Sequence, residues 1–156
     1  LSREFAGRGE ADEQVQADLE AARCLLAQPG KKEAAGQLVA EAIGVAERNP
    51  AAWLRHLARL VSAEVDVAFG RFARARQTLA ADLAAAEKAG HRLAIFEARL
   101  GALAVDRAAG VATARGALER FAVEARVAGF GAFGLRAEQL AAASAAPDAA
   151  AATSVR

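Results

Sequence analysis

The chain has 156 residues, of which 54% are hydrophobic and only 5% aromatic, a composition that suits one domain whose core is built from many small contacts. Its 20 basic and 19 acidic residues give a net charge of +1, so composition provides no general attraction to nucleic acid or to an anionic membrane. No apolar run approaches the roughly 20 residues that a membrane-spanning helix needs, and the single cysteine, Cys24, excludes an intrachain disulfide.

Helix-forming residues dominate the chain, and glycine and proline divide it into seven predicted helices. Their approximate ranges are 10–27, 32–48, 51–69, 71–89, 91–109, 111–128 and 132–145. Apolar residues recur at helical spacing within each range; Ala42 and Val45 are expected to face inward in the second helix, and Cys24 to be buried in the first. Short connections predict antiparallel neighbours, so we expect an all-α fold of three hairpins and a final capping helix.

The ends of the chain are interpreted separately. Residues 1–9 are expected to form an N-terminal arm with Phe5 as a docking anchor, residues 10–146 a helical-repeat domain, and residues 147–156 a tail. The chain begins with Leu1 and contains no methionine, whereas removal of an initiator methionine requires a small following residue. Two origins remain open: cleavage of a longer precursor, which would place the protein outside the cell, and excision from a larger cytoplasmic protein.

An internal similarity is the strongest organisational signal in the sequence. The segment 72–90, FARARQTLAADLAAAEKAG, returns in modified form at 111–129, VATARGALERFAVEARVAG, and Leu79 aligns with Leu118 at a shift of 39 residues. Ala75 likewise aligns with Ala114. Periods of this length are typical of stacked helical hairpins. Glycines are predicted to end four of the helices, and these are Gly70, Gly90, Gly110 and Gly129.

Several short patterns point to a known family. Gly70-x-Phe72-x-x-Ala75, followed by Leu79, resembles the turn and second helix of a tetratricopeptide repeat. The segment 96–140 is similar to the repeat tails of large bacterial regulatory proteins. The resemblance covers about residues 31–140, although the period of 39 departs from the usual ~34.

The same resemblance extends to two junctions in the chain. Asn49-Pro50 followed by Trp53 looks like the boundary between two such repeats, and Leu100-Gly101 looks like the Leu-Gly pair of a first repeat helix. What the resemblance implies is a tetratricopeptide-like α-solenoid that contacts other proteins through a concave groove or through the ends of the stack.

No arrangement of reactive residues predicts catalysis or a cofactor. His56 and His91 are the only histidines and lack metal-binding partners at helical spacing. The glycines of GFGAFG, residues 129–134, precede a helix without a preceding strand, which favours a turn and a close helix approach over a phosphate-binding loop. We therefore predict no catalytic residue, no metal and no cofactor.

Arginines cluster around the third and fourth helices, and Arg55, Arg59 and Arg74 are candidate interaction residues together with Phe5 and Trp53. An acidic partner surface or RNA is one interpretation. The preferred one is a solvated face, because balancing acids lie nearby in the sequence. Helical spacing further predicts two surface ion pairs, Arg115 with Glu119 and Arg120 with Glu124.

Four glycines inside predicted helices, Gly36, Gly44, Gly101 and Gly116, are expected to mark tight helix crossings that offset their low helix propensity. Taken together, the sequence favours a non-enzymatic protein whose partners are proteins, first of all copies of itself in a filament or another homo-oligomer. The alternative is a scaffold or peptide-binding module of a larger bacterial regulatory protein. An enzyme that uses the groove is the third and weakest interpretation, and nucleic acid binding and membrane insertion are not expected.

Overall fold

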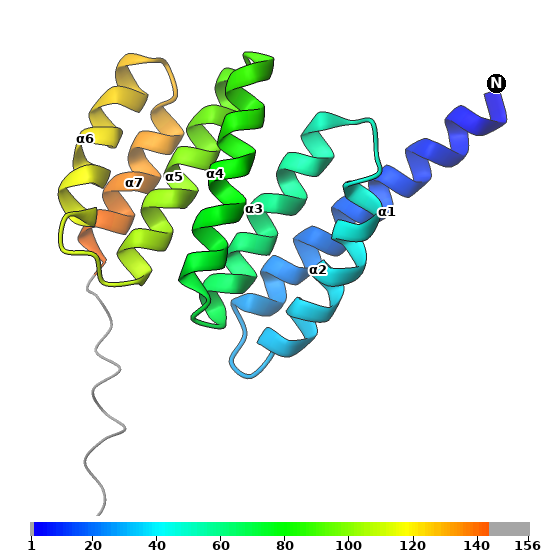
Figure 1. Ribbon diagram of the computed structural model, residues 1–156, viewed down its shortest axis with the longest axis horizontal. Helices are drawn as coiled ribbons and strands as arrows, with labels where there is room; N and C mark the ends of the chain where they lie inside the picture. Colours follow the sequence, from blue (N-terminus) through cyan, green and yellow to red (C-terminus); the bar gives the residue numbers. More distant parts are fainter. Residues whose placement is uncertain (1, 144–156) are drawn as a thin grey trace, which may run out of the picture.

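The computed structural model describes the backbone of residues 2–143 and the side chains of residues 10–143. Within these residues the chain forms helices and no strands, which confirms the prediction of an all-α fold (Figure 1). The helices are α1 (Ser2–Leu26), α2 (Lys32–Ala46), α3 (Ala52–Ala68), α4 (Phe72–Ala89), α5 (Arg92–Ala108), α6 (Ala114–Val127) and α7 (Gly131–Ala142).

Most helix bounds lie within two residues of the sequence-based ranges, and the starts of α1 and α6 differ by more. Helix α1 begins at Ser2, so the backbone of the expected arm 1–9 is helical from its second residue; the side chain of Phe5 lies outside the described residues. Helix α6 begins at Ala114, because the residues between Gly110 and the helix form a turn. Residues 144–145 of the expected last helix and the tail 147–156 lie outside the described part of the chain.

Glycine ends several of the helices in a left-handed conformation. Gly90 has φ 68° at the end of α4, and Gly129 has φ 88° after α6; a side chain would be strained at both positions. In each case the next amide donates to a carbonyl five residues back, from His91 to Ala86 at 3.0 Å and from Phe130 to Ala125 at 2.7 Å, as in a Schellman motif. Gly70 and Gly110 end α3 and α5 with φ 71° and 73°.

The GFGAFG segment also has the expected close helix approach. A Cβ atom on Gly134 would lie 2.9 Å from the carbonyl oxygen of Ala122 and 2.9 Å from Cγ of Arg126. Helix α7 therefore packs on α6 at a distance that only glycine allows, and the interpretation of these glycines as a turn and a close crossing is confirmed.

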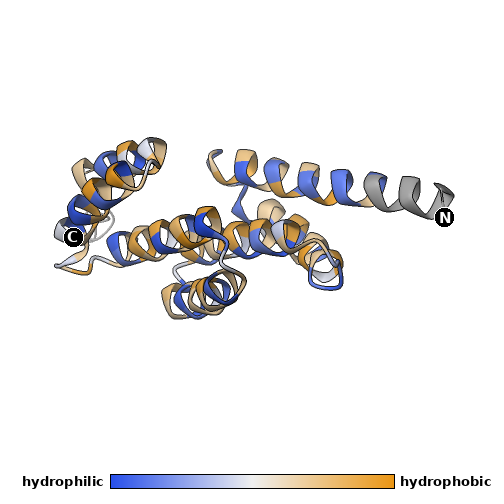
Figure 2. Ribbon diagram, turned by 90° about the horizontal axis from the view of Figure 1, so that it is seen from above, coloured by the Kyte–Doolittle hydropathy of each residue, from blue (hydrophilic) through white to orange (hydrophobic). Residues whose placement is uncertain are grey.

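The helices are arranged in two layers. Each helix contacts the next one in the chain, and α1, α3, α5 and α7 also contact one another in succession. Among the described residues, α2, α4 and α6 do not contact each other. The odd-numbered helices thus form a continuous inner layer, and the helices near the two ends of the chain lie on the same side of the central ones when the molecule is seen from above (Figure 2).

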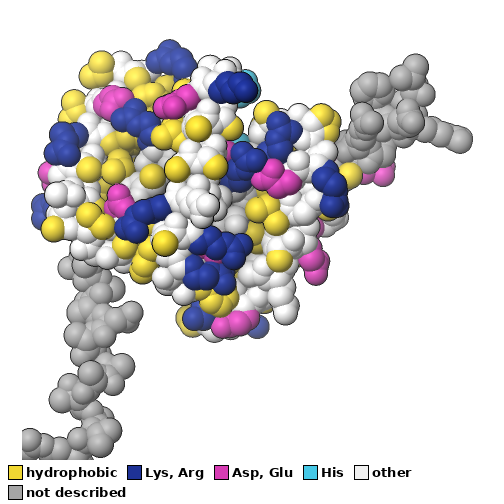
Figure 3. Space-filling view, viewed as in Figure 1, with side chains coloured by type: hydrophobic (Ala, Val, Ile, Leu, Met, Phe, Trp, Pro, Cys, Tyr) yellow, Lys and Arg dark blue, Asp and Glu magenta, His cyan; other side chains and the backbone are white. Residues whose placement is uncertain are grey.

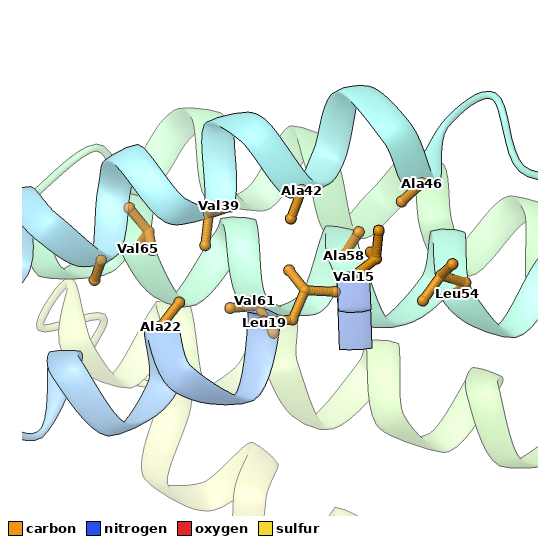
Figure 4. Packing of buried hydrophobic residues seen from close by; sticks show 11 residues of the cluster. Val15, Leu19, Ala22, Val39, Ala42, Ala46, Leu54, Ala58, Val61 and Val65 are labelled. Atoms are coloured by element: carbon orange, nitrogen blue, oxygen red, sulfur yellow. The ribbon is translucent and has the colours of Figure 1, made fainter. Parts of the chain in front are cut away.

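The buried apolar residues fall into three clusters along the stack. The first lies between α1, α2 and α3 and includes Leu19 and Leu54, both with no exposed surface (Figure 4). The second lies between α3, α4 and α5 around Leu79, and the third between α5, α6 and α7 around Leu118. Each cluster holds one hairpin against its neighbour, so the core is distributed along the molecule.

The even-numbered helices bury the same positions at nearly constant intervals. The buried residues are Ala35, Val39, Ala42 and Ala46 in α2; Ala75, Leu79, Asp82 and Ala86 in α4; and Ala114, Leu118, Phe121 and Ala125, with Ala122 in addition, in α6. The two similar segments 72–90 and 111–129 therefore bury residues at equivalent positions of α4 and α6. Helix α2 buries residues at the same spacing. The expectation for Val45 was wrong: it is 42% exposed because Ala42 and Ala46 occupy the buried face of α2.

Candidate functional site

A groove of about 270 Å³ lies over the inner layer, bordered by α1, α3, α5 and α7. Its floor is apolar, and its walls carry charged side chains. The apolar lining includes Leu60 and Val67 of α3, Leu100 and Ala104 of α5, and Phe133 and Leu140 of α7. The charged residues of the lining are Arg23, Glu64, Glu97 and Arg136.

Two rows of large apolar residues run across this inner layer. The lower row consists of Leu60, Leu100 and Leu140, which are 40 residues apart in the sequence. The upper row consists of Trp53, Leu93 and Phe133, each of which lies seven residues before the lower-row residue of the same helix, nearer the helix start. Seven residues are about two helical turns, so the two members on each helix face the same side. Trp53 is 50% exposed and Leu93 is 54% exposed; both lie outside the groove lining, near the starts of α3 and α5 and on the same helix faces as Leu60 and Leu100.

Gly101 allows the close helix packing that forms the groove floor. A Cβ atom at this position would lie 3.3 Å from Cδ2 of Leu79 and 3.7 Å from Cδ2 of Leu60, so α5 approaches both α4 and α3. Gly36 likewise faces Phe69 at 3.4 Å. The expected crossings at the other two helical glycines were wrong, since no atom lies within 4 Å of a Cβ on Gly44 and only the side chain of Arg120 approaches one on Gly116.

His56 joins three helices beside the groove. Its Nδ1 lies 2.6 Å from Oδ2 of Asp82 in α4, and its Nε2 lies 2.7 Å from Oε2 of Glu97 in α5. Burial alone would lower the pKa of His56, but the two carboxylates outweigh it through hydrogen bonds and charge and raise the pKa to about 9. The side chain is therefore an imidazolium at neutral pH that donates from both ring nitrogens.

A second ion pair forms the wall between α1 and α3. The guanidinium of Arg23 donates to both carboxylate oxygens of Glu64, at 2.9 Å and 3.0 Å. Arg136 on α7 is exposed and has no carboxylate within ion-pair distance among the described residues. The groove thus carries one positive charge at the α7 side that the described acidic residues do not neutralise.

The predicted interaction residues are not brought together at one site. Trp53 lies in the upper row, whereas Arg59 donates to both oxygens of Glu47 at 2.8 Å and Arg74 lies 3.2 Å from buried Asp66. Arg55 donates to the backbone carbonyl of Asn49. Basic and acidic side chains are intermingled on the face shown in Figure 3, which agrees with a solvated, charge-balanced surface.

Two other expectations about individual residues have different outcomes. Arg115 pairs with Glu119 at 3.1 Å as expected, but Glu124 is bound by Arg99 at 2.6 Å and 2.7 Å and not by Arg120. The prediction of an Arg120–Glu124 pair was wrong because it considered only residues of the same helix, whereas the partner of Glu124 lies on α5. Cys24, expected to be buried, is exposed on α1.

The described residues hold no arrangement suited to a metal ion. Among them, no group of three or more His, Cys, Asp or Glu side chains is placed to bind one. Within the same residues, none of the helices combines the length and the apolar character needed to cross a bilayer.

Comparison of the chain with protein-family models, with curated protein sequences and with solved structures gives no match. The functional interpretation accordingly depends on the residues of this chain and on the geometry described above.

Proposed function

We propose that this chain is a non-enzymatic helical-repeat protein that mediates protein–protein contacts through the groove over α1, α3, α5 and α7. The observation that carries this proposal is the mostly apolar groove lined by Leu60, Phe133 and Leu140, with Trp53 and Leu93 about half exposed on the same helix faces. Exposed apolar side chains beside a groove with charged residues are typical of a protein-binding site. The resemblance to tetratricopeptide repeats implies the same kind of contact.

The chemistry of the groove supports binding over catalysis. The described lining residues include no serine, threonine, cysteine, lysine or histidine, so hydroxyl, thiol, amine and imidazole nucleophiles are missing from these residues. Of its four charged residues, Arg23 and Glu64 bind each other and Glu97 is bound by His56. These carboxylates are committed to structural contacts.

A selection from displayed protein segments tests the proposal. The wild-type chain is used to enrich binding segments, which are then measured against two variants. Leu93→Glu places a charge in the upper row at a site that is 54% exposed, whereas Val123→Glu places the same charge at a site that is 59% exposed on α6, outside the groove. Circular dichroism shows whether both variants keep the fold.

We expect the enriched segments to lose affinity for Leu93→Glu and to retain it for Val123→Glu. Segments that bind both variants as tightly as the wild type would contradict a role for the groove, because the charge in the upper row would then lie outside the contact.

Self-association is a second candidate function that a different observation favours. Val123, Val127 and Leu135 are 59%, 85% and 56% exposed on α6 and α7, and the net charge of +1 provides little repulsion between copies. A contact between this hairpin and the opposite end of another copy would extend into a filament if it did not close. Such a protein would be a structural subunit.

Light scattering over a range of concentrations distinguishes the two candidates. A self-associating chain increases in mass with concentration, and Val127→Glu should shift it to the monomer while leaving groove binding unchanged. A wild-type protein that stays monomeric at the highest concentration removes self-association and leaves the groove proposal standing.

A further inference from the structure

We infer that the groove binds a small amphipathic monocarboxylate, whose apolar body fills the hollow of about 270 Å³ and whose carboxylate is bound by Arg136. This inference goes beyond the proposed protein contact, because it assigns a small-molecule ligand to the groove and holds whether or not a protein also covers it. It depends on the size of the hollow, on its apolar lining and on the one charge that the described residues leave unneutralised.

Small residues leave the space in which the body of the ligand lies. Ala63 of α3 and Gly101 and Ala104 of α5 line the groove, and they fill little of the space between these helices and α7. A protein cavity of about 150 Å³ holds benzene, so a hollow of about 270 Å³ holds a body about twice as large. A chain of about eight carbons is within this size.

The lining favours an apolar body over a polar one. Apart from four charged residues, the described lining consists of apolar side chains and one glycine. Water beside apolar side chains lacks the two to four polar partners that hold an ordered water in place. An apolar body that displaces this water gains affinity by about fourfold for each methylene that it buries.

The charge of Arg136 selects an anionic head group. The guanidinium of Arg23 donates to Glu64 at 2.9 Å. The carboxylate of Glu97 lies 2.7 Å from the imidazolium of His56. Arg136 also lines the groove and has no carboxylate partner among the described residues. A carboxylate accepts two parallel hydrogen bonds from a guanidinium, whereas an ammonium head group is repelled by it.

The head group and the body of the ligand are bound side by side on α7. Phe133 lies three residues before Arg136, and Leu140 lies four residues after it. Residues at these spacings are neighbours on one face of a helix, and all three line the groove. A carboxylate bound to Arg136 therefore places the attached apolar chain beside Phe133 and Leu140.

Nuclear magnetic resonance titration of the full isotope-labelled chain tests the inference. Three probes share an eight-carbon chain and differ only in the head group: sodium octanoate, 1-octanol and octylammonium chloride. Sodium hexanoate is the shorter carboxylate. All are used up to millimolar concentration, below the point at which they form micelles.

We expect octanoate to bind about tenfold more tightly than 1-octanol or octylammonium, because a hydrogen bond to a charged group is lost with either replacement. Octanoate should also bind about tenfold more tightly than hexanoate, which lacks two methylenes. The amide shifts that change with octanoate should lie in α3, α5 and α7.

Four variants locate the two parts of the ligand. Arg136→Gln should weaken octanoate binding about tenfold and change 1-octanol binding less than twofold, and Arg136→Glu should make octylammonium the tighter ligand. The matched control, Arg120→Gln, removes an exposed arginine of α6 outside the groove lining and should change octanoate binding less than twofold. Ala104→Phe fills the hollow and should abolish binding of octanoate and 1-octanol, while circular dichroism shows that the fold is kept.

Two kinds of result overturn the inference. Equal affinities of the wild type for octanoate and 1-octanol, or octanoate binding that Arg136→Gln leaves unchanged, reject the carboxylate contact. Octanoate binding that persists in folded Ala104→Phe, or no shift with octanoate at all, rejects the ligand site.

These results are distinguishable from a failure of the proposed protein contact. Leu93 lies outside the groove lining, so Leu93→Glu should bind octanoate like the wild type. If enriched protein segments bind Leu93→Glu as tightly as the wild type, the protein contact is rejected and the ligand site remains.

Discussion

His56 shows how a residue without partners in its own helix becomes a structural cation. Its two carboxylate partners, Asp82 and Glu97, lie 26 and 41 residues away in the sequence. Asp82 is only 3% exposed and also lies 3.7 Å from the guanidinium of Arg59. The charge of His56 thus compensates a buried acid and connects α3, α4 and α5.

The raised pKa of His56 predicts a loss of stability at alkaline pH. The pKa is about 9 in the folded chain and 6.5 when unperturbed, so the stabilisation is complete below pH 6.5 and disappears as pH rises through about 9. We expect the free energy of unfolding to fall by about 1–3 kcal/mol over this range. Urea unfolding of the wild type and of His56→Gln at several pH values measures this change in the free energy of unfolding. The variant should be less stable than the wild type at neutral pH, and its free energy of unfolding should lack the fall between pH 6.5 and 9. Parallel pH profiles for the two proteins would contradict the raised pKa of His56.

Gly134 provides a test of close packing between α6 and α7. Gly134→Ala places a Cβ atom 2.9 Å from the carbonyl oxygen of Ala122, and the backbone must shift to relieve the contact. We expect a destabilisation of about 1–3 kcal/mol, measured by urea unfolding.

The matched control is Gly44→Ala in α2, where no atom lies within 4 Å of the new Cβ. This substitution should stabilise the chain by about 0.5–1 kcal/mol, because alanine is the better helix former. Equal effects at the two positions would mean that helix propensity, and not the crossing, decides the outcome.

At the scale of elements, glycine and proline made most helices predictable from the sequence. Pro29-Gly30 lies in the turn between α1 and α2, and the glycines at 70, 90 and 110 follow the ends of α3, α4 and α5 within two residues. The start of α6 was not predictable in this way, because Val111 has helical spacing to later apolar residues but belongs to a turn. Val45 was misplaced for a related reason: alanines at 42 and 46 compete for the same buried face, and apolar character alone does not rank them.

The candidate site was predictable in part. The family resemblance singled out Leu100 and Gly101 as a repeat-helix pair and Trp53 as a repeat junction, whereas Phe133 and Leu60 were missed as groove residues. A comparison of the sequence with itself at a shift of 40 residues aligns Trp53 with Leu93 and Phe133, so this signal was present. The contacts of His56 and Arg23 carry no such signal, since they join helices through side chains of unrelated spacing.

Gly101 tests whether the floor of the groove depends on the approach of α5 to α3 and α4. Gly101→Leu inserts a large side chain where even a Cβ atom lies 3.3 Å from Leu79. Overpacking of this kind costs about 1–3 kcal/mol, which thermal unfolding measures. Gly116→Leu is the control, because only the flexible side chain of Arg120 approaches that position; an unchanged melting temperature for Gly101→Leu would reject the crossing.

At the scale of the whole molecule, the division of the core into three clusters predicts local unfolding. Among the described residues, α1 and α2 contact α3 but not α5, α6 or α7. Cooperativity between the two ends therefore passes through the contacts of α3 with α4 and α5, as expected for an elongated stack of nearest-neighbour units.

Leu118→Ala tests this division. Leu118 has no exposed surface in the third cluster, and its truncation should cost about 2–5 kcal/mol. We expect hydrogen exchange to accelerate in α5, α6 and α7 while the amides of α1 and α2 keep their rates. Uniform acceleration along the chain would show that the molecule unfolds as one unit.

The 40-residue interval between Trp53, Leu93 and Phe133 makes this row of apolar side chains adjustable in length. A chain that gained one more hairpin at this interval would add one apolar residue to each row and leave the existing residues of the rows in place. The number of hairpins would then set the length of each row. Each row could lengthen through duplication of a single segment, without redesign of the part already present.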